Sequence, residues 1–111
     1  MLVTDIDVDG GAATVSEITG TGGRADFLRH DVTSEEDWAA VCSKAVDAFG
    51  GLDILVNNAG MGDIKPIEDT TLAEWDRTAA IDQTGVFPGL KIAAPYLKAS
   101  EHASVINISS I

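Results

Sequence analysis

The sequence has little positive charge and almost no cysteine. Its 111 residues include 7 Lys+Arg against 18 Asp+Glu, which gives a formal net charge of −11. Nucleic acids and anionic membrane surfaces bind basic patches, so this charge argues against both as partners. The single cysteine, Cys42, excludes an intrachain disulfide framework and predicts a reducing compartment.

Long apolar runs and a leader peptide are also missing. No apolar stretch approaches the roughly 20 residues that a membrane helix needs. Residues 1–5 show neither the basic nor the apolar region of a secretory signal. With 45% hydrophobic residues, the composition is that of a globular protein. The sequence therefore predicts one soluble, acidic, cytoplasmic domain over residues 1–111.

Short apolar runs alternate with longer segments of helical periodicity. Strands are expected at residues 2–4, 25–29, 52–56 and 104–108. Helices are expected at residues 11–19, at 34–49 and, as one long helix, at 71–98. This alternation is typical of an α/β fold with a mostly parallel sheet, in which strand 52–56 would be buried on both faces.

The two later helices have clear start signals. Ser34 with Asp37, and Thr71 with Glu74, have the spacing of a capping box. Pro88 has no N–H for the carbonyl of the residue four before it, so a kink or break is expected there. One stripe of the long helix is expected to face the sheet: Trp75, Ala79, Asp82, Val86 and Leu90.

Two strings resemble known binding motifs but lack their context. Residues 5–10 match the first half of an EF-hand loop, yet the twelfth position is Ser16 and not the required Glu. We therefore interpret them as a strand end running into a helix. Residues 20–25 fit G-x-G-x-x-A, but a helix precedes them and a strand follows, which is the reverse of a nucleotide-binding turn. A helix-to-strand turn is expected instead.

Four separated segments together resemble the short-chain dehydrogenase/reductase family, with NAD-dependent hydroxysteroid-type enzymes as the nearest subgroup. They are the strand ending at Asp5, His30-Asp31-Val32-Thr33, Asn57-Asn58-Ala59-Gly60 and Val105-Ile106-Asn107-Ile108-Ser109-Ser110. Residues 84–87 resemble part of the family's next helix. The resemblance implies a partial Rossmann-like fold, doubly wound and mostly parallel. It also implies hydride transfer between a nicotinamide cofactor and a secondary alcohol or ketone.

The resemblance assigns the adenosine part of the cofactor to three residues. Asp5 would accept hydrogen bonds from the ribose hydroxyls and repel a 2′-phosphate, which favours NAD over NADP. Asp31 would accept from the adenine amino group and Val32 would pack on the ring. Asp31 could instead be an acid that precedes the Ser34 cap. His30 is expected to be a surface residue at a strand end.

The remaining family positions concern the nicotinamide end of the site. Residues Asn57 to Gly60 resemble the turn beneath the cofactor ribose, with Ala59 and Gly60 at the cofactor. The Asn side chains could also tie adjacent strands together. Ser110 aligns with the catalytic serine that orients the substrate carbonyl. Asp82 stands where the family has Asn, so it keeps an acceptor and loses a donor.

The chain departs from the family pattern in two further ways. The Gly-rich T-G-x-x-x-G-x-G turn is absent, and the only tyrosine, Tyr96, has Ser100 and not Lys four residues on. We therefore expect no independent turnover. The strand missing with that turn is the central one. The chain is expected either to close strand 2–4 onto strand 52–56 or to borrow a strand from a partner. An alternative is a non-catalytic fragment that acts as an oligomerisation or regulatory module. A homo-oligomer through helix 71–98 is expected.

Overall fold

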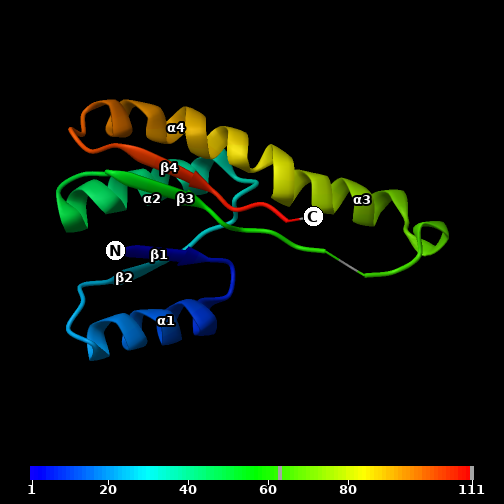
Figure 1. Ribbon diagram of the computed structural model, residues 1–111, viewed down its shortest axis with the longest axis horizontal. Coiled ribbons are helices and arrows are strands. Elements are labelled where there is room, and N and C mark those ends of the chain that lie inside the picture. Colours follow the sequence, from blue (N-terminus) through cyan, green and yellow to red (C-terminus); the bar gives the residue numbers. More distant parts are fainter. Residues whose placement is uncertain (63, 111) are drawn as a thin grey trace.

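A computed structural model describes residues 1–62 and 64–110 of the chain. It confirms the α/β class and all the expected strands and helices (Figure 1). The elements, in chain order, are β1 (Leu2–Asp5), α1 (Val8–Gly20), β2 (Asp26–Arg29), α2 (Glu35–Phe49), β3 (Ile54–Asn57), the 3-10 turn η1 (Ile67–Asp69), α3 (Leu72–Ala79), the π-helical turn η2 (Ala80–Thr84), α4 (Val86–Lys98) and β4 (Ser104–Asn107).

The described strands form two parallel pairs and not one sheet. β1 pairs with β2, with Leu2 opposite Asp26, and β3 pairs with β4, with Ile54 opposite Ser104. Helix α1 lies on one side of the first pair, and α4 runs along the second (Figure 1). The expected closure of strand 2–4 onto strand 52–56 is therefore wrong for this chain. Each pair packs against its own helix, α1 on the first pair and α4 on the second. A strand borrowed from a partner stays a prediction.

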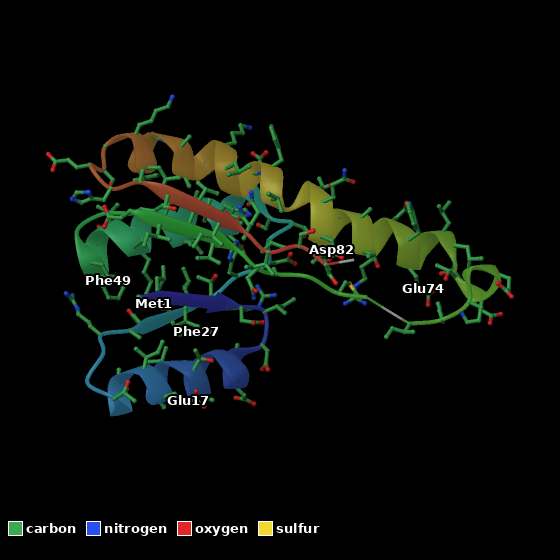
Figure 2. The ribbon with its side chains drawn as sticks, in the orientation of Figure 1. Met1, Glu17, Phe27, Phe49, Glu74 and Asp82 are labelled. Carbon is green, nitrogen blue, oxygen red and sulfur yellow. The ribbon has the colours of Figure 1, made fainter. Side chains whose placement is uncertain are left out.

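The apolar core lies between α2, α4 and β3. It consists of Trp38, Cys42, Leu55, Ala93 and Leu97. The close approach of the two helices depends on Gly89, because a Cβ there would stand 2.6 Å from Cζ2 of Trp38. In the other strand pair, a Cβ on Gly11 of α1 would collide with the ring of Phe27 (Figure 2). A glycine facing an aromatic ring thus sets one helix contact in each part of the chain.

The expected burial of strand 52–56 on both faces is wrong. Leu55 and Asn57 of β3 are buried, whereas Ile54 is 56% exposed and Val56 is 49% exposed. The reason is that helices cover only one face of the β3–β4 pair in the described chain. Every residue of β4 is exposed.

The long helix 71–98 is interrupted, as the proline predicts. Thr71 and Glu74 form the expected capping box at the start of α3. The π-helical turn η2 follows, closed by the Gly85 N–H donating to the carbonyl of Ala80 at 2.8 Å. Pro88 then lies in the first turn of α4, where its missing N–H is tolerated. The break therefore falls just before Pro88.

The stripe expected to face the sheet along this helix is wrong. Trp75 is 61% exposed, and both Asp82 and Leu90 are exposed. The π-helical turn shifts the phase of the helix, so a different set of residues is buried in α4: Pro88, Gly89, Ala93 and Leu97. α3 extends beyond the strand ends, where the described chain offers it no sheet to cover (Figure 1).

The two doubtful motifs have the local structures expected of them. Asp7 caps α1 by accepting the N–H of Asp9, and Asp5 accepts the N–H of Asp7, so these carboxylates organise a strand-to-helix turn. The segment after Gly20 is a turn that leads into β2. Within residues 1–62 and 64–110, no cluster of three or more His, Cys, Asp or Glu side chains is arranged for a metal ion. No helix of that described part is long and apolar enough to cross a membrane.

Candidate functional site

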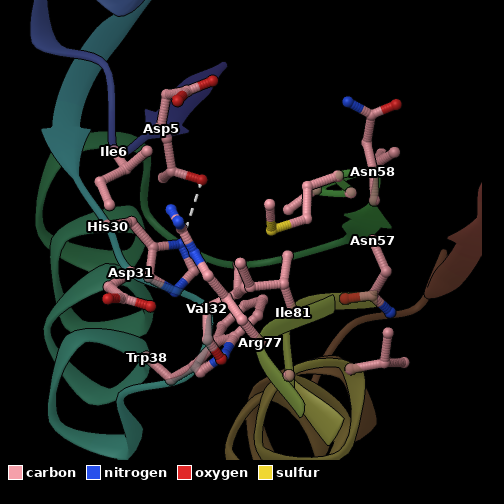
Figure 3. Close-up of a pocket in the computed structure, with 17 residues that line it drawn as sticks. Asp5, Ile6, His30, Asp31, Val32, Trp38, Asn57, Asn58, Arg77 and Ile81 are labelled. Atoms are coloured by element: carbon pink, nitrogen blue, oxygen red, sulfur yellow. Dashed lines mark hydrogen bonds between the residues drawn. The ribbon is translucent and has the colours of Figure 1, made fainter. Parts of the chain in front are cut away.

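A pocket of about 380 Å³ lies at the carboxyl ends of β1, β2 and β3. The ends of parallel strands are where α/β proteins bind ligands, and the volume is within the usual range for small molecules. Figure 3 shows Asp5, His30 and Asp31 on one side and Asn57 and Asn58 on the other. The structure thus brings together six of the residues expected at the cofactor: Asp5, Asp31, Val32, Asn57, Ala59 and Gly60.

Asp31 is held in place by its own loop. Its carboxylate accepts the N–H of Thr33 at 2.9 Å and the Thr33 hydroxyl at 2.7 Å. These hydrogen bonds from Thr33 lower the pKa of Asp31, so the side chain is ionised at neutral pH. The N–H of Asp31 donates to the carboxylate of Asp37 at 2.8 Å, which anchors the loop to the start of α2. Asp31 is therefore a fixed acceptor at the pocket wall.

Val32 offers a donor and an apolar surface beside that carboxylate. Its carbonyl accepts the indole N–H of Trp38 at 3.0 Å, which fixes the peptide plane. Among the described residues its own N–H has no hydrogen-bond partner. Asp31 and Val32 together thus present an acceptor, a donor and an apolar side chain within two residues. That combination can pair with the edge of a heteroaromatic ring.

His30 is buried, so its expected place at the surface is wrong. Its side chain is only 4% exposed and meets Trp38 edge to face, with ring centroids 4.3 Å apart. Nδ1 lies 3.3 Å from the hydroxyl of Thr4, while Nε2 is buried without a partner among the described residues. Burial lowers the pKa of His30, against a smaller raising effect of Asp37 and Asp31. A neutral imidazole therefore lines the pocket, in contact with Thr4 and Trp38.

Asn57 ties two strands together. Its side-chain Nδ2 donates to Oδ1 of Asn107 at 2.8 Å, across the register pair that joins β3 to β4. This is the structural role left open for the Asn side chains. Asn57 also lines the pocket and is buried, and its own Oδ1 has no partner in the described chain. Ala59 and Gly60 follow at the pocket rim, where small residues allow close approach of a ligand.

The two expected catalytic positions lie beside the pocket and not among its lining residues. Asp82 is exposed on η2, and its carboxylate accepts the N–H of Met61 at 2.8 Å. This bond links the segment after Gly60 to the long helix. Ser110 comes three residues after β4, at the same edge of the strands. Their catalytic roles stay predictions.

Several pocket residues were not anticipated from the sequence, and three of them come from helical segments far from the expected motifs. Trp38 comes from α2, Arg77 from α3 and Ile81 from η2. The helical periodicity gave no signal for them, because Trp38 has the spacing of an ordinary core residue and α3 was expected to pack on the sheet. Knowledge of the helix interruption would have been needed to place Arg77 and Ile81 at the strand ends.

The family described as short chain dehydrogenase matches residues 1–111, the whole chain. The chain belongs to the short-chain dehydrogenase family. Its sequence is 44% identical, over 117 residues, to trans-4-hydroxycyclohexanecarboxylate dehydrogenase of Sinomonas cyclohexanicum, a match that covers 100% of this chain and 45% of that protein. It is 42% identical, over 107 residues, to 3-alpha-(or 20-beta)-hydroxysteroid dehydrogenase of Mycobacterium bovis, covering 96% of this chain and 40% of the relative.

Solved structures of the family share the arrangement. A 7 alpha-hydroxysteroid dehydrogenase complexed with NADH and 7-oxo glycochenodeoxycholic acid is similar with a TM-score of 0.88 and 34% identity. The match covers 98% of this chain and 42% of that one. The short-chain dehydrogenase chain described here therefore spans under half the length of its relatives. Since nearly all of it superposes, the two strand pairs have the relative placement found in those longer chains.

Proposed function

We propose that the chain forms the adenosine-binding part of a nicotinamide-dependent dehydrogenase that acts on a secondary alcohol or ketone. The observation that carries the proposal is the pocket, because it joins an acid at the end of β1 to the acceptor and donor of Asp31 and Val32. A nicotinamide dinucleotide fits this donor set. When bound, the cofactor supplies the hydride acceptor or donor.

Different residues of the chain bind different parts of the cofactor and the substrate. Asp5 accepts hydrogen bonds from the ribose hydroxyls, and its negative charge disfavours a 2′-phosphate, so NAD is preferred over NADP. Asp31 and Val32 bind the adenine edge, while Ala59 and Gly60 allow the ribose to approach the backbone. Ser110 orients the substrate oxygen, and Asp82 supports the site at the family's Asn position.

The substrate of the whole protein is proposed to be a cyclic secondary alcohol or its ketone. Support comes from the names of the relatives, which are dehydrogenases of a hydroxycyclohexanecarboxylate and of hydroxysteroids. The 111 residues contain no tyrosine followed four residues later by lysine, so the chain is not expected to turn over substrate by itself. The cytoplasmic location stays a prediction from the composition.

The cofactor assignment is tested by titrating the chain with NAD and with NADP, followed by NMR. NAD is expected to bind more tightly than NADP. Asp5→Ala is expected to weaken NAD binding by about 1.5–3 kcal/mol, the value of a hydrogen bond to a charged group. Asp9→Ala, which removes an exposed acid of α1 outside the pocket, is the matched control. Equal binding of the two cofactors, or equal effects of the two variants, would overturn the role of Asp5.

Self-association is a second proposed property, favoured by the exposed apolar side chains along α3 and α4. These are Leu72, Trp75, Phe87 and Leu90. A face of this kind is typical of an interface, so a homo-oligomer through residues 71–98 is proposed, as in the non-catalytic alternative for this chain. Sedimentation velocity tests it: the chain should associate with rising concentration and Trp75→Glu should prevent association. A monomer at all concentrations would contradict the proposal.

A further inference from the structure

Arg77 is the only Lys or Arg among the described residues that line the pocket. It belongs to α3, which lies far along the chain from the strand ends that supply the acids. Figure 3 shows its side chain reaching from the helix into the pocket, on the side where Asp5, His30 and Val32 lie. Within residues 1–62 and 64–110 the guanidinium takes part in no ion pair or hydrogen bond. It is a cation available to a ligand.

The pocket carboxylates are already engaged with the backbone. Asp5 accepts the N–H of Asp7 at 2.9 Å, and Asp31 accepts the N–H and the hydroxyl of Thr33. Counted as Asp, Glu, Lys and Arg, the charged lining residues are Asp5, Asp31 and Arg77, with a formal net charge of −1. A phosphate would meet this net negative charge and two nearby carboxylates. An anionic group is therefore a poor match for Arg77 here.

A flat aromatic ring is a better match. Apolar or small residues from four segments line the pocket together with Arg77: Ile6, Val32, Ala59, Gly60 and Ile81. A planar guanidinium stacks on aromatic faces, also at an exposed position such as that of Arg77. Asp31 and Val32 offer hydrogen bonds to the edge of a ring, which leaves its face for another group.

We propose that Arg77 stacks on the face of the adenine ring and so is a further cofactor-binding residue of this pocket. The inference rests on the proposed function. It makes α3 part of the nucleotide site, in addition to the strand ends. Adenine is then held by its edge at Asp31 and Val32 and by its face at Arg77.

Adenosine tests the inference, because it has the base and ribose but no phosphate. Binding to the chain is followed by NMR titration. Arg77→Ala is expected to weaken adenosine binding on the order of 3- to 30-fold, the range for a cation–π contact. Arg77→Lys keeps the charge but loses the planar group, so an intermediate loss is expected. The side-chain protons of Arg77 should shift upfield on binding, as stacking on a ring requires.

Lys98→Ala is the matched control, since it removes one exposed cation at the end of α4, away from the pocket. An equal loss in Lys98→Ala would show a long-range charge effect and overturn the stacking role. A loss in Arg77→Ala that appears with adenosine 5′-monophosphate but not with adenosine would assign Arg77 to the phosphate and overturn it too.

The binding measurements distinguish failure of the proposed function from failure of the role given to Arg77. If the unaltered chain binds neither adenosine nor NAD, the proposed function falls and the role of Arg77 falls with it. If adenosine binds, with shifts at Asp31 and Val32, and Arg77→Ala binds it equally well, only the role of Arg77 is overturned. Circular dichroism of each variant shows that the fold is unchanged.

Discussion

The two parts of the molecule are stabilised in different ways. In residues 1–29, which hold β1, α1 and β2, only Gly11 is buried. The part that follows, from α2 to β4, contains all the buried apolar side chains of the described core: Trp38, Cys42, Ala45, Leu55, Ala93 and Leu97. The first part is thus held by strand pairing and one helix contact. The second has a core of its own.

Polar contacts join these two parts. Lys44 of α2 pairs with Asp26 of β2 at 2.7 Å, and Arg29 lies 3.6 Å from Asp37. Arg24 stacks on the ring of Phe49 at 4.9 Å. Such partly exposed contacts contribute little and weaken with salt. The pocket is therefore lined by a firmly packed part and a weakly attached part, so a ligand in it can stabilise their association.

The largest effect is expected from Trp38→Ala. It removes the central side chain of the core, which is 4% exposed, and should lower the free energy of unfolding by about 3–5 kcal/mol. Trp75→Ala is the control, because Trp75 is 61% exposed and, at a concentration too low for self-association, should change stability by less than about 0.5 kcal/mol. Urea denaturation measures both. Similar losses in the two variants would contradict the assignment of the core.

Substitution by alanine should lower stability to different extents at the two glycines, Gly89 and Gly11. Gly89→Ala places a methyl group against buried Trp38 and should destabilise the chain by about 1–3 kcal/mol, as overpacking does. Gly11→Ala meets Phe27, whose half-buried ring can turn outward, and the better helix propensity of Ala offsets the strain. Urea midpoints should therefore fall for Gly89→Ala and change little for Gly11→Ala. The reverse order would mean that the first part is the more tightly packed.

Acid should weaken the contact between the two parts by protonating His30. Since burial lowers the pKa of His30 below its ordinary 6.5, the unfolded chain binds the proton more tightly than the folded one. The stability from neutral His30 is fully present above pH 6.5 and is lost as the pH falls below it. Asp31 and Asp37 also have lowered pKa values, so their contribution is lost only below about pH 3.8.

Unfolding measured between pH 7 and 5 should show this slope in the unaltered chain and not in His30→Gln. The exposed His102 provides the control, because His102→Gln should leave the slope unchanged. A slope that persists in His30→Gln would assign it to another group.

The smallest effect is expected from the ion pairs of the junction. Lys44→Met should cost about 0.2–1 kcal/mol at low salt and almost nothing at 1 M salt. Lys91→Met breaks the exposed contact of Lys91 with Glu35, 3.5 Å long and within the second part. Hydrogen exchange should quicken in β1 and β2 for Lys44→Met but not for Lys91→Met. Identical exchange patterns in the two variants would show that the ion pair of Lys44 with Asp26 does not stabilise the contact between the two parts.

The sequence predicted what depends on local signals. The caps at Ser34 and Thr71, the turn after Gly20 and the break before Pro88 all follow from residues within a turn of one another, and the structure confirms them. The family resemblance placed Asp5, Asp31 and Ala59 together, because strand ends meet at one edge in this fold. The family assignment itself is confirmed by the match of the whole chain.

What the sequence missed depends on contacts between distant elements. His30 is buried because Trp38 covers it, and Trp38 lies there because Gly89 of another helix lets α4 approach. The π-helical turn before Gly85 shifts the phase of α4 relative to α3, and α3 extends beyond the strand ends, where Trp75 is exposed (Figure 1). No periodic pattern of apolar residues in the sequence indicates any of these contacts. Arg77 reaches the pocket for the same reason.

The most direct test of the account is hydrogen–deuterium exchange of the chain with and without NAD. Without NAD, amides of β1, α1 and β2 should exchange faster than those of α2, α4 and β3. With NAD, exchange should slow on both sides of the pocket, at residues 4–6, 30–32 and 58–61, and throughout the β1–β2 pair. Protection confined to one part, or unchanged by NAD, would contradict a nucleotide site built between the two.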